Sequence, residues 1–239
     1  MKIKIIPCLK DNYSYLIIDE EKNIACVVDP GESKPIIKYL EDNKIDLKFI
    51  LNTHHHYDHV GGNKSLKEKY GASVLGFKGD KNRIPEIDIL LSDQEVWRYE
   101  NFETKIIHIP GHTLGHISFY FYKEKFIFTG DTLFSLGCGR LFEGTHSQMY
   151  DSLKKLKELP HDTKIFCGHE YTLNNSKFCL ANDQNNQNLK NMILEIQKKL
   201  QNNLPTIPST IKQELECNIF LKADNIKTFS KLRDLKDNF

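Results

Sequence analysis

The sequence predicts an α+β protein with a β-rich domain over residues 1–172 and a smaller helical domain over residues 173–239. Short apolar runs separated by turns fill the first part, whereas the second part is polar with apolar residues at helical spacing. The residues that follow this spacing are Leu189, Ile193, Ile196 and Leu200. With 239 residues, 39% of them hydrophobic, the chain can bury a sizeable core.

The N-terminal strands are apolar runs that end at turn residues. A polar turn over residues 20–23 separates two such runs and predicts a β-hairpin. Asp-Pro-Gly at 29–31 ends the second run, and Ile36, Ile37 and Leu40 follow at helical spacing. In order, this part predicts strands at 1–7, 15–19, 24–29, 49–51 and 72–76, and helices at 34–43 and 63–69.

The middle of the chain continues with strands separated by turns, followed by a helix. Thr145 and Gln148 have the spacing of a capping box, which predicts the start of a helix through Leu156. Pro205 and Pro208 interrupt the C-terminal region, and we expect two further short helices after them. The predicted strands of this part are 105–109, 117–122, 126–131 and 164–167.

Charge and composition exclude several classes of function. The formal net charge of +1 argues against a general nucleic-acid binder or membrane-surface binder. The first residues alternate like a strand rather than a signal peptide, and no stretch approaches the roughly 20 apolar residues that span a bilayer. The six cysteines are scattered without a CxxC pair and are expected to be reduced. We therefore expect a cytoplasmic protein that binds neither nucleic acid nor membranes.

The most informative segment is the run at 53–59, which contains four histidines and an aspartate. His54, His56 and Asp58 alternate, so in an extended segment they would project to the same side. His59 comes next and can face a second centre. Imidazole nitrogens with a carboxylate suit zinc or a similar first-row divalent metal. Because so dense a polar cluster is costly to bury alone, it predicts a metal site, with a solvated polar loop as the alternative.

Three further candidate ligands follow predicted strands elsewhere in the chain: His112, Asp131 and His169. Functional residues tend to gather in loops at strand ends on a rigid scaffold. The four ligands of the 53–59 run and these three make seven. Seven ligands suffice for two ions if Asp131 bridges them and solvent fills the remaining positions.

The other residues near these positions receive structural roles. His55 and Tyr57 are interleaved with the ligands and are expected to face the other way. His116 can support a ligand from behind. The remaining histidines receive no metal role, and these are His108, His146 and His161.

At these positions the chain resembles the metallo-β-lactamase superfamily. The pattern His54-x-His56-x-Asp58-His59, with the three downstream ligands, carries the resemblance. Within the superfamily, the chain from Asp11 to its C-terminus resembles the hydroxyacylglutathione hydrolase, or glyoxalase II, family. The matching runs are 53–63, 111–113, 130–132, 137–139, 143–145 and 168–172.

The resemblance implies an αββα sandwich as the catalytic domain, followed by a helical domain that binds glutathione. It also implies two divalent metal ions, zinc above all, with iron and manganese as alternatives. The residues implied to hold the first ion are His54, His56 and His112. Those implied to hold the second ion are Asp58, His59 and His169, with Asp131 as the bridge.

Such a site is hydrolytic. Two divalent ions lower the pKa of a bridging water enough to supply hydroxide near neutral pH, and they polarise a carbonyl. Asp58 additionally orients this hydroxide. The resemblance implies that the substrate is S-(2-hydroxyacyl)glutathione, such as S-D-lactoylglutathione, which is cleaved to glutathione and a 2-hydroxy acid. A thioester suits the site because its leaving thiolate is a weak base, with a thiol pKa of about 8.5. We expect a monomer.

Glutathione carries two carboxylates, so its site needs fixed cations. The resemblance points to Arg140, Arg233 and Lys236 as these cations, and Tyr171 would add a hydroxyl. The family commonly has a tyrosine two residues after the cation at position 140, where this chain has Phe142. We therefore expect weaker glutathione binding with unchanged metal chemistry.

Two other functions stay open from the sequence. A persulfide dioxygenase with a single iron has a similar glutathione-linked fold. The pair His59 and His169 and the long helical C-terminal region favour the hydrolase over it. The second alternative is a non-catalytic metal-binding module, against which the open coordination positions argue.

Overall fold

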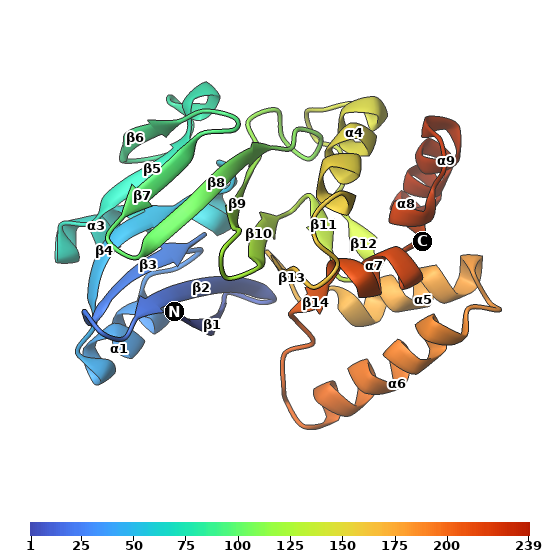
Figure 1. Ribbon diagram of the computed structural model, residues 1–239, viewed down its shortest axis with the longest axis horizontal. Coiled ribbons are helices and arrows are strands. Elements are labelled where there is room, and N and C mark those ends of the chain that lie inside the picture. The colour runs from blue at the N-terminus through green and yellow to red at the C-terminus, as the bar shows by residue number, and fades with distance from the viewer. The chain divides into compact units, whose positions relative to one another are not determined.

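The structure is a computed structural model that describes residues 1–239. The chain divides into two compact units, whose elements carry labels in Figure 1. The first unit comprises Met1–His108 and Gly115–Glu124, and the second comprises Ile109–Leu114 and Lys125–Phe239. The predicted boundary between residues 172 and 173 thus lies inside the second unit.

The first unit holds two sheets, two longer helices and two short helical turns. Its elements are β1 (Lys2–Cys8), β2 (Asn12–Asp19), β3 (Ile24–Val28), α1 (Lys34–Asn43), β4 (Asp46–Leu51), α2 (Tyr57–Val60), α3 (Asn63–Tyr70), β5 (Ser73–Phe77), the 3₁₀ turn η1 (Lys78–Asp80), β6 (Ile87–Leu91), β7 (Val96–Tyr99), β8 (Phe102–His108) and β9 (Ile117–Phe121).

The larger sheet has the strand order β1 to β6. Its first three strands are antiparallel and β3 to β6 run parallel. Helices α1 and α3 bury Ile36, Leu40 and Leu66 in one cluster with strand residues such as Leu16 and Val27. Two of these are the apolar residues whose helical spacing predicted α1, so the pattern decides which face of the helix is buried.

The antiparallel strands β7, β8 and β9 pack on the other face of that sheet. Ile50 belongs to the helix-side cluster, so its neighbour Phe49 points to the opposite face. There the Phe49 ring meets Trp97 and Tyr99 of β7 edge to face, with ring centroids 4.8 and 4.7 Å apart. Helices, one sheet and a second sheet therefore form successive layers in this unit.

The second unit is mostly helical around three paired strands and a short hairpin. Its elements are β10 (Phe126–Gly130), β11 (Leu133–Phe134), β12 (Gly137–Cys138), α4 (His146–Lys157), β13 (Lys164–Cys167), α5 (Thr172–Asn182), α6 (Gln187–Gln201), β14 (Ser209–Thr210), α7 (Ile211–Cys217), α8 (Ile219–Lys222) and α9 (Ile226–Asp237). Strand β13 pairs in parallel with β10 and antiparallel with β14, while β11 and β12 form the hairpin.

The helices of the second unit begin at polar caps. Thr145 and Gln148 form the predicted capping box of α4, in which the Gln148 N–H donates to the Thr145 hydroxyl at 3.2 Å and the Thr145 N–H donates to the Gln148 side chain at 2.9 Å. Helices α5 and α6 pack side by side, and α4 packs on α9, where Tyr150 contacts Phe229 (Figure 1). None of the helices combines the length and apolar composition that crossing a membrane requires.

Most predicted elements are present, and three expectations were wrong. Residues 57–60 form helix α2 and not an extended segment. The Gly61 N–H donates to the Tyr57 carbonyl at 2.7 Å and the Gly62 N–H to the Pro30 carbonyl at 2.7 Å, and a Cβ at Gly61 would lie 2.6 Å from the Gly31 carbonyl oxygen. The two glycines thus let the chain turn tightly against the Pro30–Gly31 backbone. Strands β6 and β7 and the short strands β11, β12 and β14 were not predicted, and three helices rather than two follow Pro208.

Candidate metal centre and pocket

The loop after β4 carries two histidines whose ring nitrogens are neighbours. Nε2 of His54 lies 3.1 Å from Nδ1 of His56. Two nitrogens bound tetrahedrally to one zinc ion at about 2.0–2.1 Å lie about 3.3 Å apart. The pair therefore has the separation of two ligands of one ion.

Asp58 and His59 lie together on α2 although the segment is helical. Nε2 of His59 is 3.5 Å from Oδ2 of Asp58, again close to the separation of two ligands of one ion. The His59 ring is buried, whereas 38% of the Asp58 side chain is exposed. The Asn12 amide donates to Oδ2 of Asp58 at 2.9 Å and to its carbonyl at 3.2 Å, which fixes the exposed carboxylate.

A buried carboxylate that the sequence did not single out lies behind these histidines. Oδ2 of Asp29 is 3.1 Å from Nδ1 of His59 and accepts the Thr53 hydroxyl at 2.7 Å. Oδ1 of Asp29 accepts the Thr53 N–H at 2.8 Å, and the Thr53 hydroxyl is 3.0 Å from Nδ1 of His54. The rings of His54 and His59 therefore place Nδ1 against protein partners, which leaves Nε2 of each as the candidate metal donor. Asp29 directly follows β3, just as the predicted ligands follow their strands. This position was the one signal in the sequence that could have identified Asp29 as part of the site.

The residues expected to be structural have other neighbours. Nδ1 of His55 lies 3.3 Å from the buried carboxylate of Asp80, and Tyr57 is 78% exposed. The buried His116 ring stacks on His54 with centroids 4.6 Å apart and an interplanar angle of 19°. This stacking restrains the orientation of the His54 ring.

In the second unit, Asp131 lies between the two candidate histidines. Asp131 follows β10 and His169 follows β13, and because these strands are parallel their carboxyl ends meet at one edge. Oδ2 of Asp131 is 3.3 Å from Nε2 of His169 and 3.5 Å from Nε2 of His112. All three side chains are buried, and Nδ1 of His112 is 2.8 Å from the Arg140 carbonyl. One carboxylate oxygen close to both nitrogens is the arrangement that a bridging ligand requires.

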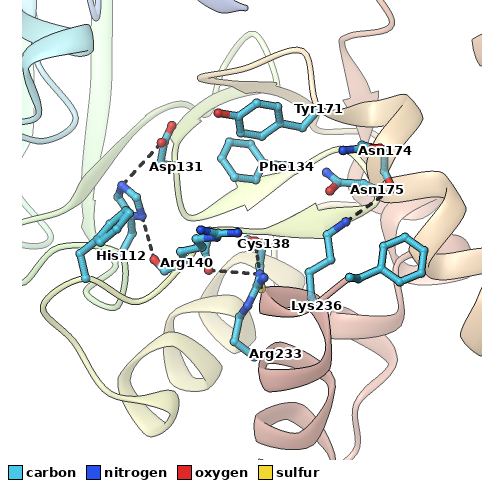
Figure 2. Close-up of a pocket in the computed structure, with 13 residues that line it drawn as sticks. His112, Asp131, Phe134, Cys138, Arg140, Tyr171, Asn174, Asn175, Arg233 and Lys236 are labelled. Atoms are coloured by element: carbon cyan, nitrogen blue, oxygen red, sulfur yellow. Dashed lines mark hydrogen bonds and ion pairs between the residues drawn. The ribbon is translucent and has the colours of Figure 1, made fainter.

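A pocket of about 440 Å³ opens beside His112 and Asp131 (Figure 2). The β11–β12 hairpin, α5 and α9 supply six of its thirteen lining residues, and the segments next to them supply others. Its lining residues are His112, Asp131, Phe134, Cys138, Gly139, Arg140, Phe142, Tyr171, Asn174, Asn175, Arg233, Lys236 and Phe239. All four residues expected to contact glutathione are in this set.

The two cations on α9 differ in environment. Arg233 is buried, and its Nη1 donates to the Cys138 carbonyl at 2.6 Å and to the Gly139 carbonyl at 3.4 Å (Figure 2). The half-buried Lys236 extends toward the Asn174 carbonyl, at 3.5 Å, and its ammonium lies over the rings of Phe178 and Phe239. Burial, followed by the charge of Arg233, lowers the pKa of Lys236.

Aromatic rings form the other side of the pocket. Tyr171 stacks on His169 with centroids 4.6 Å apart and an interplanar angle of 4°, and its ring meets Phe134 edge to face. Phe142 is 66% exposed and lies edge to face with His112 at 5.2 Å. Sequence reasoning missed Phe134, Asn174 and Asn175, since nothing in a single sequence separates them from ordinary hairpin and helix residues.

Candidate histidine and aspartate ligands at the ends of strands, beside a pocket that contains cations, are typical of a metal-dependent hydrolase. Residues 10–169 match the model of the metallo-beta-lactamase superfamily, and residues 170–239 match that of the hydroxyacylglutathione hydrolase C-terminus. The chain belongs to the hydroxyacylglutathione hydrolase family of the metallo-β-lactamase superfamily.

Individual relatives agree with this assignment. The hydroxyacylglutathione hydrolase of Pelagibacter ubique is 73% identical over 239 residues and covers 100% of both chains. That of a Bradyrhizobium species is 43% identical, over 97% of this chain and 91% of the relative. Among crystal structures, the BLEG-1 B3 metallo-beta-lactamase has a TM-score of 0.74 at 23% identity, over 93% of this chain and 100% of that chain. ETHE1 from Myxococcus xanthus has a TM-score of 0.75 at 24% identity, over 98% of this chain and 90% of that chain. The predicted family, fold class and enzyme class are confirmed.

Proposed function

We propose that this chain hydrolyses S-(2-hydroxyacyl)glutathione, such as S-D-lactoylglutathione, to glutathione and a 2-hydroxy acid at a two-metal centre. One observation carries the proposal. The chain combines the superfamily's ligand pattern with a matching hydroxyacylglutathione hydrolase C-terminal region over residues 170–239. Its 73% identical relative, which it matches over the full length, bears the same name.

The donor set supports two divalent ions, with zinc as the best fit. Nitrogen and carboxylate donors are the ligands that zinc prefers, and the measured pairs lie 3.1–3.5 Å apart. In this proposal His54, His56 and His112 hold one ion, Asp58, His59 and His169 hold the other, and Asp131 is shared. When bound, such ions lower the pKa of water and polarise the thioester carbonyl.

The protein's own groups then fix the reactants. Asp58, held by Asn12, is a half-exposed acceptor that orients the attacking water by hydrogen bonding. Arg140 and Lys236 supply positive charges for the glutathione carboxylates, and the Tyr171 hydroxyl adds a hydrogen bond. Arg233 contributes by donating to the backbone carbonyls of Cys138 and Gly139, which fixes the turn that carries Arg140. The leaving thiolate needs no dedicated acid because its conjugate thiol has a pKa of about 8.5.

The test is hydrolysis of S-D-lactoylglutathione by purified protein, with metal content measured on the same sample. We expect loss of the thioester together with two metal equivalents per chain. Absence of hydrolysis under zinc, iron and manganese loading would overturn the proposal. Oxygen consumption is followed in parallel, because uptake coupled to turnover would instead support the dioxygenase.

The proposal includes a monomer in the cytoplasm. All six cysteines are buried and none forms a disulfide, which suits a reducing compartment. Light scattering after size-exclusion chromatography tests the oligomeric state, and a mass near twice 27.8 kDa would contradict the monomer.

A further inference from the structure

A carboxylate on α9 lies between two arginines at the pocket. Oδ1 of Asp237 is 3.0 Å from Nη2 of Arg233 and 3.4 Å from Nε of Arg140. One oxygen thus takes part in two ion pairs, and one of these pairs involves a cation assigned to the substrate.

The two arginines are not equivalent partners. Arg233 is 2% exposed, and its guanidinium also donates to the Cys138 and Gly139 carbonyls. Asp237 neutralises this buried charge, which would otherwise be strongly destabilising. The Arg140 side chain is 63% exposed, and Asp237 is its ion-pair partner. The pair with Arg233 is therefore the more strongly held of the two, whereas Arg140 can turn to another carboxylate at little cost.

We propose that Asp237 is a specificity-determining residue that competes with the substrate carboxylate for Arg140 and so raises KM. The inference rests on the proposed function. In the free protein Asp237 holds Arg140 and cancels part of the pocket's positive charge. When the anionic thioester binds, Arg140 leaves Asp237 for the substrate, while the Arg233 pair keeps Asp237 in place. The same competition favours release of glutathione, which carries the same carboxylates as the substrate.

Asp237→Asn tests this competition. The amide oxygen still accepts from Arg233, but the negative charge is removed. KM for S-D-lactoylglutathione and the calorimetric Kd for glutathione should both fall about two- to fivefold, the range that exposed ion pairs contribute. Asp234→Asn is the matched control, because Asp234 lies on the same helix, pairs with His146 at 2.9 Å and does not line the pocket. It should leave both constants unchanged.

A double-mutant cycle identifies the partner. In an Arg140→Gln background, Asp237→Asn should no longer change KM or Kd, because the competed cation is gone. S-lactoyl-N-acetylcysteamine, a thioester without the glutathione carboxylates, should show the same KM with and without Asp237. If Asp237→Asn fails to fold, Asp237→Ser replaces it, since a hydroxyl also accepts from Arg233.

An unchanged or higher KM and Kd in a folded Asp237 variant overturns the inference, as does a wild-type protein that does not bind glutathione. Wild-type protein that binds glutathione but does not hydrolyse its thioesters counts against the proposed function instead. In that case the Kd comparison still decides the role of Asp237.

Discussion

Oδ2 of Asp131 lies 3.3 Å from Nε2 of His169, which joins the ends of the parallel strands β10 and β13 in one donor pair. The same oxygen is 3.5 Å from Nε2 of His112. In the proposed two-metal centre, the carboxylate of Asp131 is the ligand that the two ions share. The first prediction therefore concerns its charge.

Asp131→Asn keeps the shape of the side chain but supplies a neutral oxygen, which is a poorer metal ligand. We expect the metal content to fall from two equivalents toward one and kcat to fall by more than about 100-fold, beyond the effect typical of residues outside the ligand set. Metal analysis and steady-state kinetics on one sample measure both. Asp162→Asn, a surface carboxylate paired with Lys125, is the control. Two retained equivalents with full activity would contradict the shared-ligand mechanism.

Asp29→Asn tests the carboxylate behind His59. Asp29 has a positive φ of 48°, which asparagine also tolerates, so the backbone should be unchanged. A neutral amide orients the His59 ring less well, and we expect metal affinity to fall about 10–100-fold. Competition with a chelator measures this affinity. Asp19→Asn removes an equally buried carboxylate that accepts from Asn101 rather than from a histidine, and it should leave the affinity unchanged. Equal effects in the two variants would mean that Asp29 acts only through stability.

Local patterns in the sequence were enough to predict the elements that carry the site. The spacing of Ile36 and Leu40 predicted α1 with its observed bounds, and the apolar run before the histidines predicted β4. Each of these elements buries a continuous apolar face, so its pattern reports its environment directly. The candidate metal ligands were found from the dense histidine run at 53–59 and from the family pattern that this run forms with the three downstream positions.

Features that depend on contacts between distant residues were not predictable. Helix α2 forms because Gly61 and Gly62 pack against the Pro30–Gly31 backbone, which a local pattern does not show. Arg233 was predicted to be a cation that binds glutathione, but the carbonyls to which it donates, at the Cys138–Gly139 turn, are 95 and 94 positions away in the sequence. Only the folded chain shows that this charge is buried.

Phe142→Tyr should strengthen glutathione binding. Phe142 lines the pocket with a 66% exposed side chain, so a hydroxyl can be added without a clash or a loss of buried area. One new hydrogen bond contributes about 0.5–1.5 kcal/mol, which corresponds to a fall in KM of about two- to twelvefold with kcat unchanged. Leu173→Ile, a change at another exposed apolar residue that does not line the pocket, is the control. An unchanged KM would show that the residue at position 142 makes no contact with glutathione.

The KM for the glutathione thioester should rise at alkaline pH, because Lys236 loses its charge there. Burial lowers the pKa of this ammonium below its usual 10.5. Burial also raises the pKa of the Cys179 thiol to about 12, so this thiol stays neutral in the same range. As the pH rises through the lowered pKa, the pocket loses one positive charge and binds the anionic thioester less well.

Lys236→Gln removes this titration. Its KM should be higher than that of the wild type at neutral pH, and the two values should converge as the pH rises. Any ionisation of the substrate or of the metal centre affects both proteins, so the ratio of their KM values isolates the effect of Lys236.

The contribution of Lys236 to folding stability changes with pH in the opposite direction to its contribution to substrate binding. Between the lowered pKa and 10.5 the folded protein binds fewer protons than the unfolded chain, so the contribution of Lys236 to stability rises with pH. A KM ratio that stays constant from neutral to alkaline pH would mean that Lys236 does not bind substrate through its charge.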